Sequence, residues 1–356
     1  MQTLQILYES THKNTLFFDR KVTITQKKTI LYGPRKSGKT HLIVDHISHY
    51  AKGEVLYIDF SDDRIHPSLV AEHLSQFVKQ HPIVLLVIEH FDFSFALPPV
   101  PEIILSTPFT CKTHEGFSPL TLYPLDFEEF IAFDKKHTNI EHLFNLYANH
   151  GTFPHIVNTT ESDHHRHMQA LLHLILEPTA LAIFTRFCEL QSTKVSLFQI
   201  YNHLKTFGKI SKDKLYAITH HLIDQKLLFL VEKFGQPNAA KKVYQIDFAL
   251  KNALTFKKDF LKRFENMVFL ELMKRDKEIF YEEGIDFYLP SEGLAIICAG
   301  FAPQEVIERR IQKLLPSLWA LHVKHIEVVT LSSESALSIE GMSFSISPFW
   351  EWALQG

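Results

Sequence analysis

Along the first 150 residues, short apolar runs alternate with segments in which hydrophobic residues recur every three or four positions. Apolar runs of about four to eight residues bounded by turn signals are typical of buried strands, and the second pattern is typical of helices packed on one side. The alternation predicts a mainly parallel sheet covered by helices on both faces, because parallel strands need crossover connections. The expected strands are residues 29–32, 54–60, 83–88 and 102–105, and the expected helices are 41–50 and 67–79.

The pattern changes after residue 121, where helical periodicity continues without an intervening strand. Residues 127–133 and 140–148 are amphipathic helices and predict a helical lid. We therefore expect an α/β core over residues 1–120 and the lid over 121–180.

Residues 181–252 contain further helical segments and then two apolar runs, 227–232 and 242–246. A turn-rich connection, 234–238, separates the two runs. Three helices followed by a hairpin predict a winged helix.

Residues 253–356 form the last predicted domain, a second and smaller α/β unit. Its pattern begins with a helix and three strands, and a second helix leads to a fourth strand. The expected helices are 260–275 and 303–314, and the expected strands are 279–282, 285–289, 294–299 and 326–331.

Residues 33–40 read GPRKSGKT and fit the pattern G-x-x-x-x-G-K-[ST] between a predicted strand and a predicted helix. Glycines let the backbone wrap closely around phosphates, and its N–H groups and the helix N-terminus supply positive potential. The lysine reaches the terminal phosphates, and the threonine hydroxyl binds magnesium. The predicted nucleotide-binding residues are Gly33, Pro34, Arg35, Lys36, Ser37, Gly38, Lys39, Thr40 and Thr107.

The strand 83–88 runs into Glu89, His90 and Asp92, where a nucleotide hydrolase needs carboxylates. We expect Glu89 and Thr40 to hold Mg²⁺. Glu89, His90 and Asp92 are the candidate catalytic residues, although a neutral imidazole is a different base from a carboxylate. Asp92 has an equal alternative as the cap of the following turn.

Two further pairs of polar residues follow predicted strands, and the role of each pair has more than one interpretation. Ser106 and Thr107 follow the fourth strand, where either hydroxyl could sense a γ-phosphate. Asp62 and Arg64 follow the second strand, where they face the nucleotide or form a surface ion pair.

Composition narrows the class of protein. Hydrophobic residues make up 46% of the chain and charged residues 22%, which is typical of a globular protein. No apolar run approaches the roughly 20 residues of a membrane helix, and the N-terminal segment does not fit a secretory signal, so we expect a cytoplasmic protein without membrane contact. Cys111, Cys188 and Cys298 are too far apart for a C-x-x-C site and are interpreted as reduced thiols.

Several motifs together resemble one family, the bacterial and archaeal AAA-type P-loop ATPases with a C-terminal nuclease-like domain of unknown function. Besides the loop and the segment 62–64, residues 123–130 (YPLDFEEF) are similar to the family's PLSF-x-EF element. The remaining matches are 151–154 (GTFP) to GGFP, 264–272 (FENMVFLEL) to ENLVF-x-EL, 284–287 (GIDF) to EVDF, and the ending 347–350 (SPFW).

The resemblance implies a P-loop ATPase core, a helical lid, a winged helix and a domain similar to PD-(D/E)XK nucleases. In this sequence the family's Asp-Glu pair is replaced by Glu89-His90, and the arginine expected after Gly116 is replaced by Phe117. In the nuclease-like domain Glu271 and Asp286 match positions for a metal site. The strand 294–299 carries neither the acidic residue nor the lysine that a nuclease requires, so we expect this domain to be inactive.

We expect an ATP- and Mg²⁺-binding protein of regulatory function with weak or absent hydrolysis. One alternative is an active ATPase stimulated by DNA or oligomerisation, with His90 or Asp92 as the base. Another is a DNA-binding module with a structural ATP site. In the regulatory hypothesis, bound ATP directs the winged helix and the C-terminal domain toward a partner, and a protein partner or a homo-oligomer both stay open. The predicted phosphate contacts of the winged helix are Lys209, Lys212, Lys214, Lys241 and Lys242.

Overall fold

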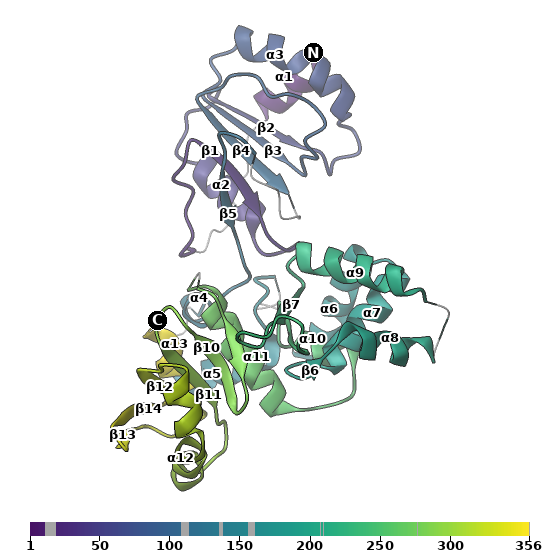
Figure 1. Cartoon of the computed structure of the whole chain (residues 1–356). Coiled ribbons are helices and arrows are strands. Elements are labelled where there is room, and N and C mark those ends of the chain that lie inside the picture. Colours follow the sequence, from purple (N-terminus) through teal and green to yellow (C-terminus); the bar gives the residue numbers. More distant parts are fainter. Residues whose placement is uncertain are drawn as a thin grey trace. The chain divides into compact units, whose positions relative to one another are not determined.

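The computed structural model describes residues 1–10, 19–107, 114–134, 138–155, 161–206, 208, 210–275 and 277–355. The chain folds into two compact units (Figure 1). The N-terminal unit consists of Met1–Pro124 with Asp224–Lys226, and the C-terminal unit consists of Leu125–Ile223 and Leu227–Gly356.

The N-terminal unit is built on a five-stranded parallel sheet with the order β2-β3-β4-β1-β5. Successive side chains point to opposite faces, so Leu56 packs in one core and its neighbour Val55 in another. Helices α1 and α3 contribute to the first core and α2 to the second, which confirms the predicted α/β architecture. The elements are α1 Gln2–Glu9, β1 Lys28–Tyr32, α2 Lys39–Ile47, β2 Val55–Asp59, α3 Pro67–Gln80, β3 Leu85–Glu89, β4 Glu102–Thr107 and β5 Ser118–Thr121.

Strand β5 was not predicted from the sequence, and neither was α1. Pro119 has no backbone N–H and argues against a strand in the middle of a sheet. The structure resolves the conflict because β5 lies at the edge of the sheet, where it pairs only with β1 among the described strands. A proline is tolerated at an edge.

The C-terminal unit begins with four helices, α4 Phe127–Ala132, α5 Ile140–His150, α6 Glu161–Ile175 and α7 Pro178–Glu189. Helix α4 starts with a capping box, in which the Asp126 carboxylate accepts from the Glu129 N–H at 2.7 Å and the Glu129 carboxylate accepts from the Asp126 N–H at 3.2 Å. These reciprocal bonds satisfy N–H groups that a helix start leaves unpaired.

A three-stranded antiparallel sheet, ordered β6-β8-β7, follows in the same unit. Its strands are β6 Lys194–Val195, β7 Leu228–Val231 and β8 Lys241–Gln245, and its accompanying helices are α8 Leu197–Lys205, α9 Lys212–Asp224 and α10 Leu250–Leu254. The two predicted apolar runs thus form the paired strands β7 and β8.

The rest of the C-terminal unit holds a six-stranded mixed sheet with the order β13-β14-β12-β11-β10-β9. Its elements are α11 Phe260–Met273, β9 Phe280–Glu282, β10 Ile285–Leu289, β11 Leu294–Cys298, α12 Gln304–Ala320, β12 His325–Thr330, β13 Ser335–Ile339, β14 Met342–Pro348 and α13 Phe349–Leu354. Helix α12 was predicted to end at residue 314, before Pro316. It continues through this proline to Ala320, because Leu315 and Leu318 are buried in the core on the same face.

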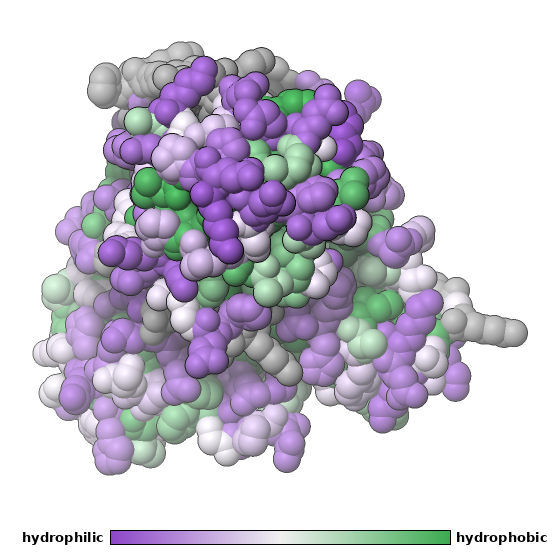
Figure 2. Space-filling model, turned by 90° about the horizontal axis from the view of Figure 1, so that it is seen from above, coloured by the Kyte–Doolittle hydropathy of each residue, from purple (hydrophilic) through white to green (hydrophobic). Residues whose placement is uncertain are grey.

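Strands β13 and β14 and helix α13 were not predicted from the sequence. The signal for β14 was present, since Phe344 and Ile346 alternate with serines and are buried while Ser343 is exposed. No helix in the described part of the chain combines the length and apolar character needed to cross a membrane. On the face shown in Figure 2, hydrophilic residues predominate and hydrophobic residues lie in separate groups.

Candidate functional site

The loop between β1 and α2 has a backbone that its glycines make possible. Gly38 has φ 104° and Lys36 has φ 66°, so the chain turns through the left-handed region twice before α2 begins. A Cβ atom on Gly33 would lie 2.2 Å from the carbonyl oxygen of Leu122. The loop therefore depends on glycine at its first position.

The side chain of Lys39 lies inside this loop and is only 9% exposed. Its ammonium donates to the carbonyl oxygens of Gly33 and Pro34 at 2.8 and 2.9 Å. Burial lowers the pKa of Lys39 to about 8, although the Glu89 carboxylate opposes this change. The positive charge of Lys39 is thus held inside the loop by two carbonyl oxygens and by attraction to the Glu89 carboxylate.

Two more groups fit a phosphate-binding loop. The Ser37 hydroxyl is buried and has no hydrogen-bond partner among the residues that the structure describes. Buried polar atoms without a partner are rare in native proteins, and such an atom inside this loop fits a site that binds phosphate oxygens. The Arg20 guanidinium donates to the carbonyl oxygens of Ser37 and Tyr123, at 2.9 and 2.8 Å, and so fastens the loop to the segment after β5.

Glu89, at the end of β3, lies beside the start of α2. One carboxylate oxygen accepts from the Thr40 hydroxyl at 3.0 Å, and the other accepts from the Tyr57 hydroxyl. Glu89 is buried while Thr40 is exposed. A carboxylate and a hydroxyl are the oxygen ligands that Mg²⁺ prefers, so these two residues fit the predicted magnesium site.

His90 is held by a carboxylate from the neighbouring strand. Its Nδ1 lies 2.8 Å from an oxygen of Asp59, which the parallel register of β2 and β3 sets opposite Glu89. Burial opposes ionisation of Asp59, but the hydrogen bonds from His90 and Ser61 together outweigh it and lower the pKa of Asp59. His90 also has φ 57°, a conformation that is uncommon outside glycine and is often found at functional sites.

The other residues predicted for the nucleotide site differ in their exposure and in their partners. Asp92 is exposed, and its carboxylate accepts from the Ser94 N–H at 3.0 Å, which is the arrangement of a turn cap. Asp62 and Arg64 form an exposed ion pair at 2.6 Å, the surface alternative. Thr107, at the end of β4, is buried and pairs in register with Tyr32, the last residue of β1.

Three residues of this site were not predicted, namely Arg20, Tyr57 and Asp59. Asp59 carried a signal, because it is the last residue of a parallel strand and such ends meet at one edge of the sheet. Tyr57 lies two positions before Asp59 on the same face of β2, but the contact with Glu89 also depends on the register of β2 and β3. Arg20 lies outside any motif, and the sequence offers no signal for its contacts.

The second predicted site, in the C-terminal unit, does not form as expected. Glu271 accepts from the Phe127 N–H at 3.0 Å and from the Tyr147 hydroxyl at 2.9 Å, both among the first helices of this unit. Asp286 has other partners, Lys242 and Arg310. Glu271 and Asp286, which match metal-site positions in the sequence, therefore have separate partners, and Glu271 ties α11 to the start of α4.

The lysines predicted to contact DNA phosphates differ in burial and in their ion pairs. Lys242 is buried and paired with Glu265 and Asp286, so the expectation that it can contact DNA phosphates is wrong. Lys241 pairs with Glu232. Lys212 and Lys214 are exposed on α9, whereas Lys209, like Cys111, lies outside the described residues.

No protein-family model matches the chain. The chain is 23% identical, over 396 residues, to the uncharacterized protein MJ1544 of Methanocaldococcus jannaschii, with 93% of this chain and 89% of the relative covered. Among solved structures it is similar to the Walker-type ATPase PABY2304 of Pyrococcus abyssi, at 13% identity and a TM-score of 0.45, over 64% of this chain and 91% of that one. The ORC1 protein of Aeropyrum pernix, solved in complex with DNA, is 12% identical with a TM-score of 0.33, over 65% of this chain and 87% of that one.

Proposed function

We propose that the N-terminal unit binds ATP together with Mg²⁺. The observation that carries this proposal is the buried Lys39 ammonium, which lies on loop carbonyl oxygens next to the Thr40–Glu89 contact. A triphosphate would replace the carbonyl oxygens as the partner of the ammonium and would supply the acceptor that the Ser37 hydroxyl lacks.

Magnesium would be held by the Thr40 hydroxyl and the Glu89 carboxylate. Mg²⁺ keeps several water ligands and takes the rest from one or two protein groups and the phosphates. Tyr57 fixes one oxygen of Glu89 and leaves the other directed at Thr40. This arrangement supports binding of the metal without requiring a second carboxylate.

We further propose that the bound nucleotide regulates the protein and is hydrolysed slowly or not at all. The residue after the magnesium carboxylate is His90, and the exposed Asp92 is engaged in its turn. In this proposal the helices α4 and α5 belong to a lid, the three-stranded part is a winged helix, and the six-stranded part is nuclease-like without nuclease activity. A cytoplasmic location remains part of the same proposal.

Isothermal titration with ATP tests the binding proposal. We expect magnesium-dependent binding that Lys39→Ala reduces at least about a hundredfold, because the variant loses a desolvated charge that contacts phosphate. Lys52→Ala is the matched control, since Lys52 is an exposed lysine of the same unit outside the loop. Equal affinities for wild type and Lys39→Ala would refute the proposal.

A second candidate function is ATP hydrolysis stimulated by DNA or by oligomerisation, and the His90–Asp59 contact favours it. A carboxylate that binds Nδ1 orients the ring and fixes its tautomer, as is common for catalytic histidines. Phosphate release from a single turnover, with and without DNA, would test this function. Release at the same rate in wild type, His90→Ala and Asp92→Ala would exclude both residues as the base.

A further inference from the structure

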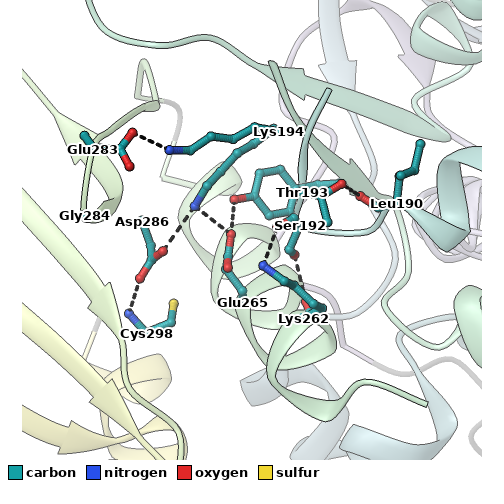
Figure 3. A network of polar contacts seen from close by, with 12 residues as sticks. Leu190, Ser192, Thr193, Lys194, Lys262, Glu265, Glu283, Gly284, Asp286 and Cys298 are labelled. Atoms are coloured by element: carbon teal, nitrogen blue, oxygen red, sulfur yellow. Dashed lines mark hydrogen bonds and ion pairs between the residues drawn. The ribbon is translucent and has the colours of Figure 1, made fainter. Parts of the chain in front are cut away.

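A buried ion network joins three elements of the C-terminal unit (Figure 3). The Lys242 ammonium, from β8, donates to a Glu265 oxygen at 2.9 Å and to an Asp286 oxygen at 3.1 Å. Glu265 comes from α11 and Asp286 from β10, and in Figure 3 dashed lines join one oxygen of each carboxylate to the same ammonium. The Tyr244 hydroxyl donates to the same Glu265 oxygen at 2.7 Å.

The second oxygen of Asp286 is also engaged. It accepts from the Cys298 N–H at 2.9 Å and from the Arg310 guanidinium at 3.2 Å. Burial disfavours the charge of Lys242, but attraction by Asp286 and Glu265 outweighs it and raises the pKa of Lys242. The lysine side chain, 7% exposed, therefore remains a cation inside the protein.

These contacts do not fit a divalent metal at the same carboxylates. Mg²⁺ and Ca²⁺ need about six or more oxygen ligands, and here the ammonium occupies the space that both carboxylates face. Strand β11, next to β10, supplies Leu294–Cys298, which contains no carboxylate. Among the described residues no three His, Cys, Asp or Glu side chains are grouped to hold a metal.

We propose that the Lys242 ammonium is the cation that the Glu265 and Asp286 carboxylates bind in the native protein. It excludes a divalent metal from these carboxylates, and its ion pairs attach the β7–β8 hairpin to α11 and β10. The proposal is independent of nucleotide binding, since every residue in it belongs to the C-terminal unit.

Neighbouring contacts attach the hairpin to β9 as well. The Tyr281 N–H donates to the Glu232 carbonyl oxygen and the Phe234 N–H donates to the Tyr281 carbonyl oxygen, each at 3.0 Å, so the residues that follow β7 pair with β9. Lys194 pairs with Glu283 at 2.6 Å on the exposed side (Figure 3). The hairpin is thus held by backbone pairing with β9 and by the buried ammonium of Lys242.

Binding of Mn²⁺ to the nucleotide-free, full-length protein tests the exclusion of metal. Wild type and Glu265→Gln should bind the same number of Mn²⁺ ions with the same affinity in isothermal titration. Loss of one Mn²⁺ site in Glu265→Gln would overturn the proposal, because the carboxylate would then be a metal ligand in the native protein.

Thermal unfolding tests the role of the ammonium. Lys242→Met leaves the buried Glu265 carboxylate without a cation and leaves Asp286 paired with Arg310 alone. It should lower the melting temperature by about 10 °C, whereas the control Lys241→Met, at a half-buried neighbour on β8, should lower it by about 2 °C or less. Lys242→Met/Glu265→Gln removes the charge conflict and should recover more than half of the loss. A double variant no more stable than Lys242→Met, or a single variant as stable as wild type, would overturn the proposal. If Lys242→Met does not fold, folding of the double variant supports it and failure of the double variant counts against it.

Discussion

The buried ammonium of Lys39 predicts opposite pH dependences for the stability of the nucleotide-free protein and for its affinity for ATP. Burial lowers the pKa of Lys39 from 10.5 to about 8. A bound triphosphate would raise this pKa again, because nearby negative charge favours the protonated form. The pKa therefore depends on whether the loop holds a nucleotide.

The sign of each effect follows from proton binding. In the nucleotide-free protein the unfolded state binds more protons than the folded state between about pH 8 and pH 10.5, so stability rises with pH across that window. Across this window the free energy of unfolding rises by about 3 kcal/mol, at about 1.4 kcal/mol per pH unit. For ATP the sign is reversed: above about pH 8 binding takes up a proton, and the dissociation constant increases up to about tenfold per pH unit.

Isothermal titration between pH 7 and 9.5, in buffers of different ionisation enthalpy, measures both the affinity and the proton uptake. Lys39→Arg is the control, because a guanidinium stays charged over this range and the pH dependence should vanish even if binding is weaker. A wild-type dissociation constant that is constant over this range, or the same slope in Lys39→Arg, would refute the assignment of the effect to Lys39.

Two further changes test other contacts. Tyr57→Phe removes the hydroxyl that fixes Glu89, and it should weaken magnesium-dependent ATP binding about fivefold, the equivalent of about 1 kcal/mol, while leaving binding in a chelator unchanged; equal losses in both conditions would contradict this. Gly151→Ala places a Cβ 2.4 Å from an oxygen of the buried Asp247 at φ 87°, and it should lower the free energy of unfolding by about 3 kcal/mol in urea titrations. Gly235→Ala, at φ 66° with open space around it, should cost about 1 kcal/mol, and equal costs at the two glycines would exclude the clash as the cause.

Much of the N-terminal fold follows from the sequence, because buried parallel strands read as continuous apolar runs and recognisable helices follow β1 and β2. The loop followed from its motif alone. Tyr57 and Asp59 did not, since their contacts with Glu89 and His90 depend on the register of β2 and β3, which apolar runs do not specify. The register of β2 and β3, and with it the contacts of Tyr57 and Asp59, therefore became known only from the structure.

The errors in the C-terminal unit have equally local causes. Glu265 and Glu271 are six residues apart on α11, a spacing that directs side chains to different sides of a helix, and the sequence alone did not indicate which side faces β10. Lys242 was treated as a surface lysine, although it shares a face of β8 with Tyr244. Both contact Glu265, a carboxylate more than twenty residues farther along the chain.

The proline in β5 has a consequence for how molecules of this protein associate. An outer strand normally offers a row of unpaired backbone groups that can template pairing with another chain and lead to aggregation. Pro119 interrupts that row with a residue that cannot donate, in the middle of a strand only four residues long. Pairing of a second chain with β5 is thereby disfavoured, and an oligomer that extends this sheet by strand pairing would have to use the opposite edge, at β2.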